Sequence, residues 1–228
     1  IVDGPSGVGM VGSATISNKL RRAAGDETVK AVVLLANSPG GSALASEVMW
    51  RDIENLRSKK PVVVSMGAYA ASGGYYVSAP ADMIIASRST LTGSIGVFGM
   101  LLNYGDALRN KLGVTVDVAK TNQYADVGSS FRSVTPVERQ RIMQGIEDVY
   151  KTFVGHVADG RNMSFSEVDA IGGGRVWSGA DAKDIGLVDD FGGLTDAITA
   201  AASMANVSGD YRVREMVEQP DNITQMRR

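Results

Sequence analysis

Two glycine-rich runs hold the residues whose types and spacing could do chemistry. They are residues 37–41 (NSPGG) and residues 70–76 (AASGGYY). The second run is expected at a strand-to-helix turn, where free backbone N–H groups and the helix dipole favour developing negative charge near Ser72. The N–H of Gly73 can face a tetrahedral oxyanion, and the turn at Gly40 and Gly41 can supply a second donor. The runs therefore predict a serine nucleophile with an oxyanion hole. The alternative is structural: glycines at 73 and 74 also let a helix pack tightly on a sheet.

A serine hydroxyl needs a base before it can attack a carbonyl. The one histidine, His156, is expected late on a long helix beside core-facing Val157, and we interpret it as a partly exposed helix residue. A neutral lysine is the other option, provided that burial lowers its pKa. Most of the lysines stand beside polar neighbours, as surface lysines do; they are at positions 19, 30, 59, 60, 111, 120, 151 and 183. None of them is singled out as the base by its surroundings.

The elements that must position these runs alternate between strands and helices. Apolar, β-branched runs predict buried strands, and apolar residues at helical spacing predict helices between them. Ser42 is expected to cap the helix that carries Leu44, Val48, Met49, Ile53 and Leu56. The expected strands are 29–35, 61–66, 83–86 and 114–118, and the helix holding Ser72 is expected over 69–77. This order predicts an α/β fold with a parallel sheet and flanking helices.

The second half of the chain is expected to be mainly helical. A long amphipathic helix is predicted over 136–159, with Thr135 as its cap and Glu138 three residues later. Its apolar face is expected to hold Ile142, Ile146, Val149, Phe153 and Val157. Shorter helices are predicted over 164–171, 179–185 and 195–204, and a strand over 211–216. We expect one domain, 1–228, with 205–228 as a peripheral tail whose polar end frays.

Composition narrows the function classes. The chain has 228 residues, a net charge of −2 and 44% hydrophobic residues, which is typical of a soluble globular protein that does not bind nucleic acid. It contains no cysteine, which excludes disulfides, thiol catalysis and cysteine-based metal sites. No cofactor and no metal site is expected. The chain opens with Ile1 rather than Met, so we expect an excised piece from which any leader or anchor has been removed.

Four blocks in order resemble the S49 family of serine peptidases, the signal peptide peptidase A type. They are residues 37–47 (NSPGGSALASE), 70–76 (AASGGYY), 90–99 (TLTGSIGVFG) and 175–189 (RVWSGADAKDIGLVD), and the match runs roughly from Val29 to Ala201. The resemblance implies a crotonase-like (ClpP-like) fold and a Ser-Lys dyad. It further implies a homo-oligomer, held at the inner membrane by an N-terminal anchor absent from this chain. On the periplasmic or extracytoplasmic side, this oligomer would degrade cleaved signal peptides.

Carried over residue by residue, the resemblance gives four site residues. Ser72 matches the nucleophile, and Gly41 and Gly73 match the glycines whose N–H groups bind the oxyanion. Ser94 matches the serine that orients the lysine amine.

The chain departs from the family pattern at the position of the base. Single-domain relatives carry it in a segment resembling IKSGKYKD, at the lysine just before the aspartate. Here residues 118–126 read VAKTNQYAD, so Lys120 aligns with the first lysine and Ala125 stands at the catalytic position. In long tandem members the lysine lies in the N-terminal half and the nucleophile in the C-terminal half. The chain is thus expected to be the C-terminal half of a tandem form, with its lysine supplied by the absent N-terminal domain.

Two other functions stay open at this point. The first is a crotonase-fold acyl-CoA hydratase or isomerase, which shares the two-donor oxyanion hole but uses carboxylates and no serine nucleophile. The second is a non-catalytic oligomerisation domain, and a degenerate inactive peptidase is a related outcome. Tyr75, Tyr76 and residues 95–102 are candidates for apolar substrate pockets, and each is also compatible with ordinary core.

Overall fold

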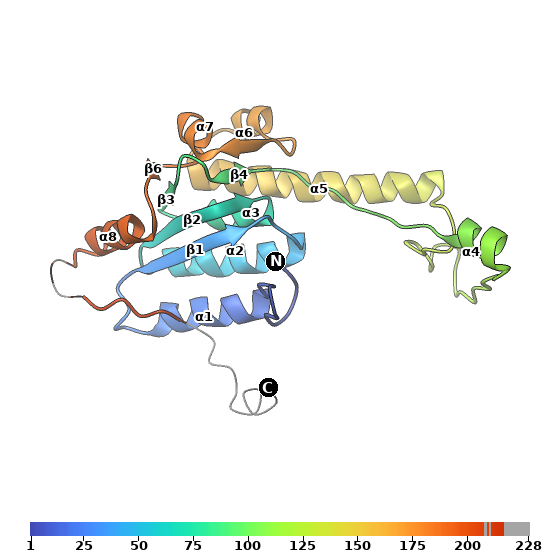
Figure 1. The fold of residues 1–228 in the computed structure, drawn as a ribbon, viewed down its shortest axis with the longest axis horizontal. Helices are drawn as coiled ribbons and strands as arrows, with labels where there is room; N and C mark the ends of the chain where they lie inside the picture. Colours follow the sequence, from blue (N-terminus) through green and yellow to red (C-terminus); the bar gives the residue numbers. More distant parts are fainter. Residues whose placement is uncertain (208, 210, 217–228) are drawn as a thin grey trace, which may run out of the picture.

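The structure is a computed structural model that describes residues 1–207, 209 and 211–216. Its elements alternate between helices and strands as far as β3, and after β4 most of the elements are helices (Figure 1). They are, in chain order, α1 Ser13–Gly25, β1 Val32–Ser38, α2 Ala43–Arg57, β2 Val62–Ala71, α3 Gly73–Ser78, β3 Met83–Ala86, β4 Leu91–Gly93, α4 Gly105–Leu112, α5 Pro136–Arg161, α6 Phe165–Ile171, β5 Val176–Ser178, α7 Gly179–Asp184, β6 Asp190–Phe191 and α8 Leu194–Met204.

The sheet is built around β2, which pairs with three other strands. β1 lies parallel to β2 on one side. On the other side β3 pairs with the first half of β2, and β4 pairs with its second half, both in parallel. β6 extends the sheet beside β3 in parallel, whereas β5 pairs with β4 in the antiparallel sense. The sheet is therefore mostly parallel, and β2 runs through its centre to the edge where Ser72 follows.

Alternation along β2 divides the core between the two faces of the sheet. Val62, Val64 and Met66 belong to the larger apolar cluster, which is formed with α1, α2, α3 and the second half of α5. Val63 points to the opposite face and packs with Ala197 and Ala201 of α8. Successive side chains of a strand point to opposite faces, so a continuous valine run is what a strand covered on both faces requires.

Several predicted elements are confirmed, some with shifted ends. Ser42 caps α2, since its side chain accepts a hydrogen bond from Ala45 N at 3.1 Å, but Leu44 and Val48 are exposed rather than core-facing. Thr135 and Glu138 form the predicted capping box at the start of α5. The predicted strand 29–35 is found three residues later, as β1. The predicted helix 69–77 begins only at Gly73, because residues 69–71 continue β2 and pair with β4.

Two predicted strands are wrong. Residues 114–118 form no strand: Val114, Val116 and Val118 are exposed, and no strand among the described residues pairs with them. Residues 211–216 also form no strand, although Arg214 pairs with Asp26 at the end of α1. The predicted fraying end lies outside the described residues. β-branched alternation is a local signal, whereas a strand needs a partner.

Residues 97–149 form a long projection, which we call the arm. The segment after β4 runs out beside α5 to α4, and the chain returns along the first half of α5 (Figure 1). The second half of α5 is in the core, through Phe153, Val154 and Val157, whereas Ile142 and Ile146 on the predicted apolar face are only half-buried. Of the helices in the described ranges, none is both long enough and apolar enough to cross a membrane.

Candidate active site

Three strands end at the same edge of the sheet, and each is followed by a segment that the sequence singled out. Ser38 at the end of β1 is in register with Ala70 of β2, and Ala71 at the end of β2 is in register with Gly93 of β4. Ser72 and Ser94 therefore leave two neighbouring parallel strands side by side. Ligands of open α/β sheets bind at the carboxyl ends of strands, so this edge is the place to look for a site.

Ser72 occupies a strained turn between β2 and α3. Its φ of 51° and ψ of −120° are a conformation that a residue with a side chain rarely adopts. The turn is held from both sides: Ser72 N donates to Gly93 O at 2.9 Å, and Tyr76 N donates to Ser72 O at 2.8 Å. Its side chain makes no capping bond to α3. Strain of this kind persists where the surroundings enforce it and is found preferentially at functional sites.

The loop after β1 lies directly against this turn. A Cβ placed on Gly40 would lie 2.8 Å from Ser72 Cβ, and Gly40 has a φ of +115°, so only glycine fits there. A Cβ placed on Gly73 would lie 3.3 Å from Gly41 N and 2.6 Å from Ser46 Oγ. The backbone nitrogens of residues 41 and 73 are therefore neighbours. Across the part of the chain that the structure describes, neither N–H has a hydrogen-bond partner.

The glycine loop is anchored by the first residues of the chain. Ile1 N donates to Gly40 O at 2.8 Å, and Ser42 N donates to Ile1 O at 3.0 Å. Ser42 Oγ also donates to Asp3 at 2.9 Å. These bonds hold the groups on either side of Gly41 and leave its own N–H free. Two fixed, unpaired donors beside a serine are the arrangement that stabilises a developing oxyanion.

Ser94 is fixed in a second strained turn. Its φ is 48°, its N–H donates to Arg175 O at 2.7 Å, and Gly174 N donates to Ile95 O at 2.8 Å. These two bonds continue the β4–β5 pairing past the end of the strands. Within the described residues, neither Ser72 Oγ nor Ser94 Oγ is bonded to another protein group, so both hydroxyls are available to a ligand or an incoming side chain.

No lysine of the described residues bonds to the serine. Lys120 belongs to the arm, in the loops around α4 that lie away from the sheet (Figure 1). There its Nζ donates to Asp126 at 3.0 Å and to Gln123 O at 3.2 Å. His156 is half-buried, as predicted, and its ring bonds to Glu47 rather than to the serine.

The tyrosines named as pocket candidates are core residues. Tyr75 is fully buried, and its hydroxyl donates to Leu187 O at 2.9 Å; burial raises its pKa well above the usual range. Tyr76 is also buried, and its hydroxyl donates to Glu47. Ile95 is buried too, whereas Phe98 and Met100 are exposed, so only the later part of 95–102 remains open to a ligand. The Glu47–Tyr76–His156 contact was not predicted, because these residues are far apart in the sequence.

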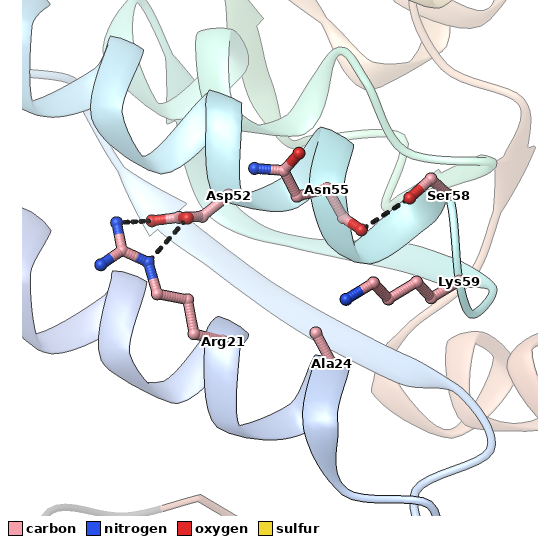
Figure 2. Close-up of a pocket in the computed structure, with 6 residues that line it drawn as sticks. All are labelled: Arg21, Ala24, Asp52, Asn55, Ser58 and Lys59. Atoms are coloured by element: carbon pink, nitrogen blue, oxygen red, sulfur yellow. Dashed lines mark hydrogen bonds and ion pairs between the residues drawn. The ribbon is translucent and has the colours of Figure 1, made fainter.

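A cavity of about 350 Å³ lies elsewhere, between α1 and the second half of α2 (Figure 2). Arg21 and Asp52 form a two-bond ion pair at its edge, with distances of 2.9 and 3.1 Å. The other lining residues are Ala24, Asn55, Ser58 and Lys59. None of the predicted site residues lines this cavity. Among the residues described, no cluster of three or more His, Asp or Glu side chains is placed to hold a metal ion.

Comparison with known proteins finds a family match and similar sequences. Residues 54–208 match the family model "Peptidase family S49". The chain is 45% identical to "Protease 4" of Salmonella typhi over 91% of this chain and 33% of that protein. It is 37% identical to "Putative signal peptide peptidase SppA" of Enterococcus faecium over 79% of this chain and 52% of that protein. The chain thus spans about a third of one relative and half of the other.

A structural comparison identifies the fold. A mutant form of ClpP1 from Listeria monocytogenes superposes with a TM-score of 0.56 at 14% identity, covering 82% of this chain and 86% of that chain. At this identity the likeness shows the fold alone, and it confirms the predicted ClpP-like, crotonase-like α/β architecture. The match over residues 54–208 shows that this chain belongs to peptidase family S49, a family of serine peptidases.

Proposed function

We propose that this chain is the nucleophile-bearing, C-terminal half of a tandem-domain serine endopeptidase. The observation that carries the proposal is the convergence of a strained Ser72 with the two unpaired N–H groups of Gly41 and Gly73. The base is a lysine of the N-terminal half. This assignment is supported by Ala125 at the position where single-domain relatives carry their lysine, and by the chain's 33% share of Protease 4.

In this mechanism the neutral lysine takes the proton from Ser72 Oγ as the oxygen attacks a peptide carbonyl. The carbonyl oxygen becomes an oxyanion and accepts hydrogen bonds from the N–H groups of Gly41 and Gly73. The lysine then gives its proton to the leaving amine, which departs and leaves an acyl-enzyme. Water, deprotonated by the same lysine, releases the acid product. Ser94, beside Ser72, orients the lysine amine through its unpaired hydroxyl.

The substrates are extended peptides, cleaved signal peptides among them. The name of the Enterococcus relative supports this class. We further propose an extracytoplasmic site of action at the inner membrane, with an anchor outside this chain.

We also propose that the working form is a homo-oligomer joined through the arm. Large apolar side chains are exposed along its whole length; they include Phe98, Met100, Leu101, Leu102, Leu112, Val116, Tyr124 and Met143. Exposed large apolar side chains gathered on one projecting segment are typical of a protein interface. The second copy would cover it and supply the strand that residues 114–118 lack.

The test is fluorophosphonate labelling of the chain with and without its N-terminal half, using Ser72→Ala as the blank. We expect labelling only in the combined sample, and peptidase activity at least about 10³-fold lower in the blank. Ser89→Ala, an exposed serine of the same chain, is the matched control and should label fully. Strong labelling of the chain alone would mean a base within these residues, with Lys120 tested first. No labelling in either sample would favour a scaffold or an acyl-CoA enzyme.

A further inference from the structure

One carboxylate joins three helices behind the candidate site. Glu47 Oε2, on α2, accepts the hydroxyl of Tyr76 from α3 at 2.5 Å and lies 3.0 Å from Nε2 of His156 on α5. Burial, together with the Glu47 carboxylate, raises the pKa of Tyr76 well above its usual range, so the phenol keeps its proton and is the donor. A carboxylate only accepts, so the ring nitrogen facing it carries a hydrogen as well.

Aromatic contacts hold this carboxylate in place. Trp50, one turn after Glu47 on α2, stacks on His156 with ring centroids 3.5 Å apart and an angle of 15° between the planes. The ring of Tyr76 packs against that of Phe153 with centroids 4.6 Å apart. It lies edge-on to the His156 ring with centroids 5.5 Å apart. The side chain of His156 is only 17% exposed, so its ring has little freedom to turn away. Glu47 is thus held on both sides by groups that are themselves packed.

The helices that meet at Glu47 also carry the two oxyanion donors. The N–H of Gly41 directly precedes Ser42, the cap of α2, and the N–H of Gly73 is the first of α3. The separation of these donors is therefore set by how α2 packs on α3. In the structure as described, the bond from Tyr76 to Glu47 is the side-chain hydrogen bond that joins α2 to α3. Tyr76 also bonds through its own N–H to the carbonyl of Ser72.

We propose that Glu47, held by Tyr76 and His156, is a positioning residue for the oxyanion hole. It fixes the spacing between the Gly41 and Gly73 N–H groups and touches neither the serine nor the substrate. The inference rests on the proposed function of Ser72 and adds a role for a residue outside the site. Donors aimed at an oxyanion act on the transition state and little on the bound substrate. Loss of Glu47 should therefore lower kcat and leave KM nearly unchanged.

The experiment compares Glu47→Ala, Glu47→Gln and Tyr76→Phe in the combined, active protein. We expect kcat to fall roughly 10- to 100-fold in Glu47→Ala, with KM within about twofold and affinity for a peptide aldehyde falling in parallel. In Glu47→Gln the fall in kcat should be smaller, because the amide oxygen still accepts the hydrogen bond from the Tyr76 hydroxyl. Glu54→Gln is the matched control, since it removes an exposed pair with Arg57 on the same helix and should change nothing. An unchanged kcat and aldehyde affinity in Glu47→Ala and Tyr76→Phe would overturn the proposal.

A second readout uses this chain alone and needs no activity. Backbone amide resonances of Gly41 and Gly73 should shift in Glu47→Gln and Tyr76→Phe and stay in place in Glu54→Gln. If both glycine resonances are unmoved in folded Glu47 and Tyr76 variants, the positioning role is wrong. If they move as expected while the combined wild-type protein neither labels nor cleaves peptides, the proposed function fails and the coupling between α2 and α3 stands.

Discussion

At the carboxyl edge of the sheet, hydrogen bonds within this chain hold two strained backbone turns in place. On the arm, the chain leaves extended backbone and large apolar side chains in solvent. Ser72 and Ser94 are kept at positive φ by hydrogen bonds from neighbouring strands and loops. On the arm, Val114, Val116 and Val118 alternate with polar residues as in a strand, but within the part of the chain that the structure describes no strand pairs with them. The first region is held in place within one chain, and for the second we propose a partner. The nucleophile and oxyanion donors belong to the first, and we assign the base and the assembly contacts to groups outside this chain.

The prediction with the largest expected effect tests whether the carboxyl edge of the sheet contains an oxyanion hole. Gly73→Ala would bring a Cβ within 2.6 Å of Ser46 Oγ and 3.3 Å of Gly41 N, forcing the two donors apart. We expect a fall in kcat of about 10²–10³-fold, the range found for loss of one oxyanion donor. Steady-state kinetics of the combined protein measures it. Gly25→Ala, at the end of α1 with nothing within 4 Å, is the control and should keep full activity. Full activity in Gly73→Ala would show that the N–H groups of Gly41 and Gly73 are not the oxyanion hole.

The next effect tests whether the arm is the assembly surface. Phe98 and Met100 are 90% and 76% exposed, so replacing both with serine removes apolar area without opening the core. We expect self-association to weaken at least about tenfold, measured by sedimentation, while the far-UV circular dichroism stays the same. Val8→Ser, equally exposed at 92% but in the N-terminal loop, should leave association unchanged. Equal association of all three proteins would place the interface elsewhere.

The sequence predicted the candidate site better than it predicted the arm, for a physical reason. Ser72, its glycines and the cap at Ser42 are local signals, because a turn or a helix start depends on a few adjacent residues. Residues 114–118 carried an equally clear strand pattern, yet strand formation depends on a partner that no local pattern specifies. Helix α1 was missed for another reason: its buried face includes Ser13, Thr15 and Ser17, which show no apolar period. The Glu47 contact joins three helices, so no spacing in the sequence predicts it.

A pH titration tests how the arm holds itself together without an apolar core of its own. Arg132 pairs with Asp126 at 2.8 Å and with Glu138 at 2.6 Å, beside the capping box of α5. The bond with Arg132 is the main cause that lowers the pKa of Glu138 to about 2, and the pKa of Asp126 is lowered as well. A folded pKa below the unfolded one gives stability that is present above about pH 4.5 and lost as pH falls toward 2.

We therefore expect amide exchange in residues 120–140 to accelerate between about pH 4.5 and 2, after correction for intrinsic rates, before exchange in β2 does. Arg132→Leu should show the faster exchange already at pH 7 and lose most of the pH dependence. Arg109→Leu, which breaks an exposed pair with Asp106 on α4, is the matched control and should behave as wild type. Simultaneous loss of protection in the arm and in β2 would show that the two regions unfold as one unit.

The prediction with the smallest expected effect compares the two halves of α5, one in the arm and one in the core. A Cβ placed on Gly145 has no atom within 4 Å, whereas one placed on Gly160 would collide with the carbonyl of Ala79 and lie 3.3 Å from Pro80 Cα. Alanine is favoured over glycine inside a helix by about 0.8–1 kcal/mol, so Gly145→Ala should stabilise the arm by roughly that amount. Gly160→Ala should instead destabilise the whole chain, because the carbonyl is backbone and cannot turn aside. Amide exchange in α5 and thermal unfolding measure the two effects. If Gly145→Ala also disturbed the fold of the separate chain, the arm half of the helix would be packed in solution, and the contrast between the two regions would fail.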